Sequence, residues 1–215
     1  MKLALDTMPT VFIVGGGAPY ERMFEDLGWA LTKNIRLADL IQFTGGEDVS
    51  PYLYGHHKHP TTHTNLARDR RERQVFLFGK KAGIPMAGIC RGGQFLNVMC
   101  GGTLFQDVDN HVGEHDVIDE RTSEVFRASS THHQMMIPGP EGVVICTASE
   151  SCRRERMPTK TTIRRMTNDG PLGEDIEAVH YPEDMAFCFQ PHPEFYRLTD
   201  LSNRYGAYLE ELLYS

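Results

Sequence analysis

The feature that most constrains the fold is a cysteine between an apolar run and a helix-forming segment. Residues 87–102 read AGICRGGQFLNVMCGG, so Cys90 has Gly88 two residues before it and Gly92 two residues after it. G-x-C-x-G after a buried strand is the cysteine version of the G-x-S-x-G nucleophile elbow. The turn from strand to helix is tight there, so both flanking positions need residues without bulky side chains. The sequence predicts a strand at 85–89, a helix at 91–99 and Cys90 at the turn.

A cysteine at such a turn is suited to act as a nucleophile. Open α/β sheets place their sites at the carboxyl ends of the strands. Partial positive charge at the helix N-terminus favours thiolate over thiol, and the amide N–H of Arg91 is free to point at a developing oxyanion. A buried structural cysteine, the competing interpretation, would not need both glycines. We expect Cys90 to be the nucleophile.

Strand-like and helix-like patterns alternate around this turn. Apolar runs at 10–14, 38–43 and 85–89 alternate with helical spacing at 20–32 and 66–81. This order predicts a mostly parallel central sheet with helices on both faces.

The second half of the chain has a different pattern. Short alternating runs are separated by turn residues, among them Asn168-Asp169-Gly170 and Pro182-Glu183-Asp184, and predict extra antiparallel strands beside the parallel sheet. An amphipathic pattern at 198–213 predicts a closing helix. Residues 47–65 are predicted to form a long loop. The strand-like runs are 124–127, 143–147, 161–166, 176–180 and 185–189.

The composition excludes several classes of function. The chain has 215 residues and a net charge of −7, which argues against a general nucleic-acid binder. Its five cysteines are irregularly spaced and form no disulfide framework or CxxC pair. The N-terminus is interrupted at Asp6, and no apolar run approaches the ~20 residues of a membrane span. We expect a soluble, cytoplasmic protein with no membrane partner.

A base for the cysteine is found in Gln190-Pro191-His192-Pro193-Glu194. The two prolines are expected to hold this segment extended, and residues i and i+2 of an extended chain point the same way. Glu194 can then accept a hydrogen bond from His192 and fix its tautomer. This predicts a Cys90, His192, Glu194 triad.

Other patterns predict neither a metal nor a cofactor. His111 and His115 match H-x-x-E-H, but Gly113 and the preceding Asp109-Asn110 indicate a turn rather than the helix that this zinc motif needs. The four histidines of the 47–65 loop lack metal-site spacing. Gly15-Gly16-Gly17 is neither a P-loop nor a dinucleotide fingerprint.

Two charged segments are expected to be mostly solvated. Residues 68–73 are predicted to form a solvent-exposed helix face, with one pair anchoring the 47–65 loop. Residues 150–165 form a basic patch, interpreted as a solvated loop, with a docking surface for an acidic partner as the alternative.

With Cys90, His192 and Glu194 in this order, the chain resembles the class I glutamine amidotransferase-like superfamily. Within it, the resemblance is closest to the γ-glutamyl hydrolase family, including bacterial γ-glutamyl-γ-aminobutyrate hydrolases. The motifs that carry it are TGGEDVSPYLYG (44–55), ARDRRERQVF (67–76), GICRGGQFLNVMCGGTLFQDV (88–108), THHQ (131–134) and QPHPEF (190–195).

The resemblance implies one flavodoxin-like, three-layer domain over residues 1–215. It implies hydrolysis of a γ-glutamyl amide, with no cofactor, through a glutamyl-thioester on Cys90. It places the amide N–H groups of Gly46 and Arg91 in the oxyanion hole. The substrate-binding residues that it implies are Gly45, Gln94, His132, His133 and Gln134.

Three departures from the family pattern are visible. Ser129 stands where asparagine is usual, Pro191 replaces an aromatic residue, and 150–165 has no recognisable counterpart. None is expected to touch the triad, and all three could alter what is bound beyond the γ-amide.

Three functions remain open. The first is a stand-alone hydrolase of glutamine or a γ-glutamyl-amine, a small-molecule substrate. The second is a glutaminase that delivers ammonia to a separate synthetase chain. The third is a redox or binding protein on the same scaffold, which the His192/Glu194 pair argues against.

Overall fold

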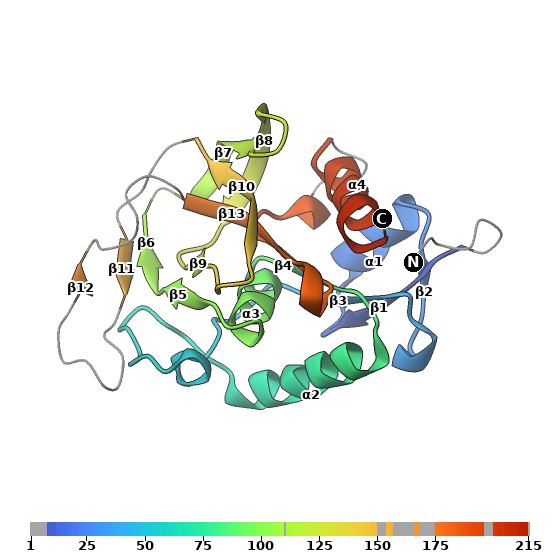
Figure 1. Ribbon diagram of the computed structural model, residues 1–215, viewed down its shortest axis with the longest axis horizontal. Coiled ribbons are helices and arrows are strands. Elements are labelled where there is room, and N and C mark those ends of the chain that lie inside the picture. The colour runs from blue at the N-terminus through green and yellow to red at the C-terminus, as the bar shows by residue number, and fades with distance from the viewer. Residues whose placement is uncertain are drawn as a thin grey trace.

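A nine-stranded mixed sheet forms the centre of the protein (Figure 1). The computed structural model describes residues 8–109, 111–149, 154–156, 166–167, 175–195 and 200–214. The sheet order is β2-β1-β3-β4-β14-β13-β10-β7-β8, in which the first five strands are parallel and each later strand is antiparallel to its neighbours. The strands are β1 (Thr10–Val14), β2 (Ala30–Leu31), β3 (Leu40–Phe43), β4 (Met86–Ile89), β7 (Val112–Asp119), β8 (Glu124–Thr131), β10 (Val143–Ala148), β13 (Asp175–Tyr181) and β14 (Ala186–Phe189).

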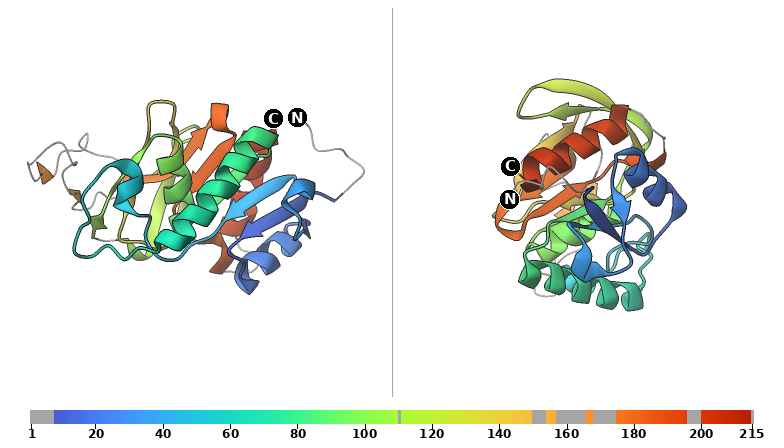
Figure 2. Two further views of the ribbon diagram at one scale, coloured as in Figure 1. Left: turned by 90° about the horizontal axis from the view of Figure 1, so that it is seen from below. Right: turned by 90° about the vertical axis from the view of Figure 1, so that its right-hand side faces the viewer.

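Helices cover both faces of the sheet. Helices α1 (Ala18–Asp26) and α4 (Asp200–Tyr214) pack on one face, and α2 (Leu66–Ala82) and α3 (Arg91–Met99) pack on the other (Figures 1 and 2). Each face has its own apolar core, because alternate strand residues point to opposite sides. The expected fold, a three-layer α/β sandwich with extra antiparallel strands, is confirmed.

Most predicted elements in the first half are present, with one correction. The helix predicted over 20–32 ends at Asp26, and Ala30–Leu31 instead forms β2 beside β1. Gly28 lies between them at φ 82°, a left-handed conformation that ends the helix and turns the chain back. The helical spacing continued past the true end because β2 is also partly apolar.

The position of β14 corrects a second expectation and builds the site. The run 185–189 was expected among the antiparallel strands, but β14 is antiparallel only to β13 and runs parallel to β4. Phe189 pairs with Ile89, so the residues that follow these two strands emerge at the same edge of the sheet. That edge therefore receives both Cys90 and the 190–195 segment.

Smaller elements lie toward the end of the molecule opposite β2 (Figure 1). One pair of strands is β5–β9, and a small sheet has the order β12-β11-β6. Several expected features lie outside the described residues. They are the strand at 161–166 apart from Met166, the turn at 168–170, residues 198–199 of the closing helix and most of the basic segment. The strands at this end are β5 (Thr103–Phe105), β6 (Asp107–Val108), β9 (Met135–Ile137), β11 (Arg154–Arg156) and β12 (Met166–Thr167). Elsewhere in the described residues the chain also forms short 3-10 helices, at Ile35–Leu37, Pro51–Tyr54, Pro182–Asp184 and Pro193–Phe195.

The described helices were also compared with the dimensions of a lipid bilayer. Within the described part of the chain, none combines the length and the apolar character that crossing a membrane requires.

Candidate active site

Cys90 occupies a strained turn between β4 and α3. Its backbone has φ 52° and ψ −115°, outside the regions that non-glycine residues usually adopt. The amide of Cys90 donates to the carbonyl of Phe189 at 2.7 Å, and its carbonyl accepts from the amide of Gln94 at 3.0 Å. The neighbouring strand and the new helix thus hold the turn from both sides.

The glycines beside Cys90 are required by close backbone packing. A Cβ atom on Gly88 would lie 2.3 Å from the carbonyl carbon and oxygen of Gly92. A Cβ atom on Gly92 would lie 2.4 Å from the carbonyl oxygen of Phe43 on β3. Backbone atoms cannot swing aside as side chains do, so both positions need glycine. This is the steric reason that the sequence pattern indicated.

His192 and Glu194 lie on the segment after β14. Nδ1 of His192 is 2.7 Å from Oε1 of Glu194, and both residues are buried. The segment is not extended as expected: residues 193–195 form a 3-10 turn, closed by the amide of Phe195 donating to the carbonyl of His192. The Phe195 ring stacks on the imidazole at 4.3 Å, which further fixes the orientation of His192.

Cys90 and His192 face each other beside Gly45. A Cβ atom built on Gly45 would lie 3.3 Å from Cε1 of His192 and 3.7 Å from Cβ of Cys90. Burial lowers the pKa of His192, but hydrogen bonding and charge from Cys90 and Glu194 outweigh it and raise the pKa to about 10. Glu194 can only accept when ionised, so Nδ1 carries a proton and Nε2 is the ring atom that can exchange a proton with the thiol. This arrangement suits proton transfer between Cys90 and His192.

Strand β8 holds the histidine from the other side. Oγ1 of Thr131 is 2.9 Å from Nε2 of His192. The hydroxyl of Ser129 donates to the His192 carbonyl at 2.9 Å, and the His192 amide donates to the Ser129 carbonyl at 3.2 Å. The expectation that the Ser129 departure does not touch the triad is therefore wrong, because β8 ends directly against this segment.

Tyr20 of α1 connects two parts of the site and was missed by sequence reasoning. Its hydroxyl accepts from the amide of Gly45 at 2.9 Å. Burial raises the pKa of Tyr20, and the charge of Glu194 raises it further. A tyrosine within an apolar helical stripe carries no sequence signal for such a role.

The side chain of Arg91 is anchored away from the nucleophile by buried acids. Its guanidinium donates to Asp69 and Glu72 of α2 and to the carbonyl of Glu47 at 3.1 Å. Burial lowers the pKa of Arg91 to about 10, which still leaves it protonated at neutral pH. Asp69 and Glu72 are each 2% exposed, so the prediction of a mostly solvated face is wrong for these two residues. Their i, i+3 spacing is the signal that could have revealed a shared face.

A pocket of about 180 Å³ opens beside Cys90. Seven of the ten predicted site residues line it: Cys90, both expected oxyanion-hole residues and four of the expected substrate-binding residues. The other three, Gly45, His192 and Glu194, lie next to it. A larger hollow of about 960 Å³, between the β7–β8 hairpin and α4, contains no cysteine or histidine in its lining. The smaller pocket is lined by Gly46, Glu47, Asp48, His63, Cys90, Arg91, Gln94, Thr131, His132, His133 and Gln134.

Gln134 organises the wall opposite the elbow. Its carbonyl accepts from the side chains of Gln94 at 3.1 Å, Gln190 at 3.1 Å and His132 at 2.9 Å. Its side-chain amide donates to Thr62 at 3.1 Å, while its Oε1 is buried and has no hydrogen-bond partner among the described residues. That oxygen is an available acceptor in the pocket wall.

The two neighbouring histidines of this wall differ in environment. His133 is partly exposed, and a bond of 3.1 Å to Asp48 raises its pKa. His132 is buried, which lowers its pKa, and both of its ring nitrogens are directed at protein groups, Gln134 and Glu177. The implied substrate role thus fits the ring of His133 better than that of His132.

Solved structures share this fold along nearly the whole chain. PurLQS from Thermotoga maritima aligns with a TM-score of 0.64 at 16% identity, over 96% of this chain and 98% of that one. A protein from Thermoplasma acidophilum, described as a subunit of GMP synthase, aligns with a TM-score of 0.64 at 12% identity, over 94% and 93%. At these identities the likeness is one of fold alone.

Sequence similarity assigns the chain to a particular family. The profile of the peptidase C26 family matches residues 29–194, and the chain belongs to this family. The glutamine amidotransferase-like protein YvdE of Lactococcus lactis subsp. lactis is 33% identical over 190 residues, 80% of this chain and 77% of that protein. A YvdE homologue of L. lactis subsp. cremoris is 43% identical over 98 residues, 40% of this chain and only 52% of that protein.

Proposed function

We propose that this protein hydrolyses the γ-glutamyl amide bond of glutamine or a γ-glutamyl-amine, with residues 1–215 acting as one domain. The observation that carries the proposal is the strained Cys90 turn facing His192, which is itself bonded to Glu194 at 2.7 Å. A nucleophile, a base and a group that orients the base are the parts that acyl transfer requires.

In the proposed reaction, the Cys90 thiol gives its proton to Nε2 of His192, and the sulfur attacks the side-chain amide carbon. The amide N–H groups of Gly46 and Arg91 stabilise the oxyanion, as the helix N-terminus favours. His192 gives its Nε2 proton to the leaving amine, and a glutamyl-thioester remains on Cys90. His192 then takes a proton from water, which attacks the thioester and releases glutamate, while Glu194 orients the ring throughout.

The size and charge of the pocket support a small zwitterionic head group. A volume of about 180 Å³ is below the ~300–1,000 Å³ typical of drug-sized ligands. The lining carries both signs: the exposed Glu47 can face an ammonium, and His133, whose pKa the bond to Asp48 raises, can face a carboxylate. A free γ-glutamyl group has both an α-ammonium and an α-carboxylate.

The test is turnover by wild type and Cys90→Ala on glutamine and a panel of γ-glutamyl-amines, following released glutamate. We expect release by wild type only. Cys100→Ala is the matched control, because Cys100 lies outside the pocket and burial raises the pKa of its thiol. Equal release by wild type and Cys90→Ala would contradict the proposal.

A second candidate is a glutaminase that delivers ammonia to a synthetase chain. It is favoured by the identity of two proteins with this fold, PurLQS and the subunit of GMP synthase. No turnover on the whole panel, with Cys90 still alkylated by a glutamine-analogue electrophile, would support this candidate. Rapid turnover of a γ-glutamyl-amine by the isolated chain would exclude it.

A further inference from the structure

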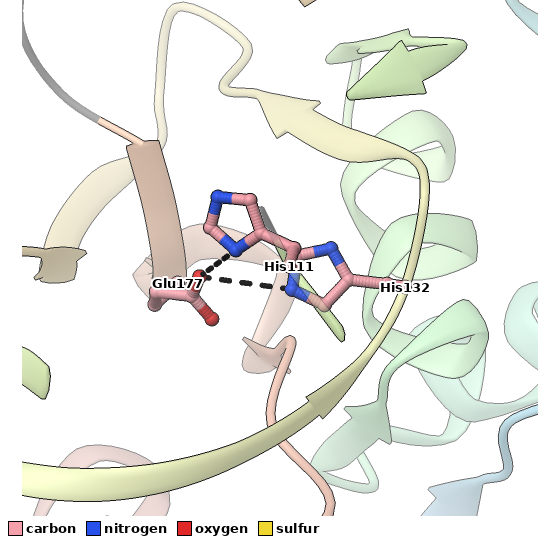
Figure 3. Close-up of side chains that lie close together, drawn as sticks. All are labelled: His111, His132 and Glu177. Carbon is pink, nitrogen blue, oxygen red and sulfur yellow. Dashed lines mark ion pairs between the residues drawn. The ribbon is translucent and has the colours of Figure 1, made fainter. Parts of the chain in front are cut away.

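Behind the wall of the pocket lies a buried cluster of histidines and acids. His111 precedes β7, His132 follows β8, and Glu177 lies within β13; the three side chains point toward one another (Figure 3). They are 2%, 3% and 0% exposed, respectively. Their ligand-type atoms all lie within 4.8 Å of one another.

The sheet brings these three residues together from distant parts of the sequence. Val112 pairs with Thr131 in the β7–β8 hairpin, so His111 and His132 flank the open end of that hairpin. The pairing of β10 and β13 shifts register at Glu177: its neighbours Ile176 and Ala178 pair with β10, and Glu177 does not. Bulges of this kind re-aim a side chain.

The structure of the H-x-x-E-H motif differs from the one that the sequence predicted. Residues 112–119 form a strand, so the expectation of a loop or turn at 111–115 is wrong beyond His111. Glu114 is exposed on the hairpin, whereas Glu177, which is 63 positions away, occupies the centre of the cluster. His115 also points inward, with Nε2 3.1 Å from Oε1 of Glu177.

Outer partners fix which nitrogen of each ring faces Glu177. Nε2 of His111 is 3.0 Å from Oδ2 of Asp175, and Nδ1 of His132 is 2.9 Å from the carbonyl of Gln134. Both partners are acceptors, so these nitrogens carry the protons of neutral rings. Nδ1 of His111 and Nε2 of His132 then direct lone pairs at the same carboxylate. Carboxylate–histidine and carbonyl–histidine pairs of this kind are the usual outer shell of a metal site.

The separations of these atoms match those of ligands around a metal ion. Oε1 of Glu177 is 3.2 Å from Nδ1 of His111 and 3.6 Å from Nε2 of His132. A charge-assisted bond would be about 2.7–2.9 Å, as it is between His192 and Glu194 at 2.7 Å. Ligands around a tetrahedral zinc ion, with metal–ligand bonds of about 2.0–2.1 Å, lie roughly 3.4 Å apart.

Two buried atoms of the cluster also have no hydrogen-bond partner among the described residues. They are Nε2 of His132 and Oε2 of Glu177. Buried polar atoms are normally paired, and a bound ion would satisfy both. The carboxylates of Glu177 and Asp175 would also balance the charge of a divalent cation.

We propose that His111, His132 and Glu177 bind a divalent transition-metal ion, zinc in class, with Asp175, Gln134 and His115 holding the ligands in place. Two imidazole nitrogens and one carboxylate oxygen are a ligand set that suits such ions. The ion joins the hairpin end to β13 next to Thr131, the residue that contacts His192. It acts as a tether behind the pocket and takes no part in the acyl transfer.

The experiment measures metal content and Co²⁺ binding in the untagged, full-length chain. We expect about one equivalent of metal in wild type, and visible Co²⁺ absorption when the stripped protein is reloaded. Zn²⁺ should also raise the Tm of the stripped protein. Glu177→Gln should weaken Co²⁺ binding by about 100-fold or more, and Asp175→Asn, which keeps all three ligands, by roughly 10–100-fold.

His57→Gln is the matched control, since His57 is an exposed histidine of the 47–65 loop. Its Co²⁺ binding should equal that of wild type. Wild type that binds no Co²⁺ would overturn the proposal. The cluster would then be held together by hydrogen bonds alone. Binding that survives Glu177→Gln and Asp175→Asn, or that is lost in His57→Gln, would assign the metal to the loop and overturn it equally. Asp175→Asn also provides the answer if Glu177→Gln does not fold.

Discussion

Adding a single methyl group at Gly88 should disrupt the cysteine turn without altering any chemical group of the site. In Gly88→Ala, the new Cβ atom would lie 2.3 Å from the carbonyl carbon and oxygen of Gly92 and 2.5 Å from the amide nitrogen of Gly93. Ordinary contact begins at 3.4 Å, so α3 must move by about 1 Å relative to β4. The backbone of Gly88 does not have a positive φ, so the effect is one of space alone.

The displacement should lower both stability and turnover. Overpacking of a core typically costs about 1–3 kcal/mol, and contact with backbone on one rigid helix places this change at about 3 kcal/mol. For a chain of this length, that corresponds to a Tm roughly 6–12 °C lower. A misplacement of about 1 Å at the nucleophile should also reduce kcat by about 100-fold. Differential scanning calorimetry and glutamate release measure the two effects.

Gly206→Ala is the matched control. Its Cβ atom would meet only the flexible end of the Leu27 side chain, at 3.1 Å, and alanine favours the helix. We expect a stability change within ~1 kcal/mol and unchanged turnover. A Gly88→Ala protein with the Tm and kcat of wild type would refute the steric explanation of the G-x-C-x-G pattern.

Three further predictions concern the charged groups of the site. Glu194→Gln should lower kcat by about 10²–10⁴-fold through loss of the His192 orientation, with KM little changed in steady-state kinetics. The pKa of His192 rises from about 6.5 in the unfolded chain to about 10 in the fold. Protonated His192 therefore stabilises the folded state fully below pH 6.5, and this stabilisation is lost as the pH rises toward 10. The Tm advantage of wild type over Glu194→Gln should therefore shrink across that window, and an advantage that grows with pH would contradict it. Glu72→Gln leaves the buried Arg91 partly unpaired and should cost about 3–5 kcal/mol in denaturant unfolding, whereas Arg73→Gln on the exposed side of α2 should cost less than ~0.5 kcal/mol.

Local structure around the elbow could be predicted from the sequence because it depends on neighbouring residues. The residue pattern of 10–14 and 91–99 predicted β1 and α3 with their observed bounds. Gly88 and Gly92 indicated the tight turn at Cys90, since two backbone segments can approach this closely only where the residue has no side chain. The pairing of His192 with Glu194 was also predicted, although the reason given, an extended segment, was wrong.

The sheet order decided which distant segments meet, and short-range patterns contain no such information. Only the parallel pairing of β14 with β4 places His192 beside Cys90. Only the end of β8 brings Ser129 and Thr131 against the same histidine.

The charged and histidine-containing segments show the same limit most clearly. A run of charges predicts a solvated face, yet Asp69 and Glu72 are buried because α2 packs where Arg91 can neutralise them. No spacing along the chain indicated that Nδ1 of His111 lies 3.2 Å from Oε1 of Glu177 on β13, because only the tertiary structure brings the two residues together. The sequence alone determined the cysteine turn, the elements beside it and the identity of the chemical groups. The tertiary structure decided which of those groups face one another, because contacts between strands depend on topology and not on spacing along the chain.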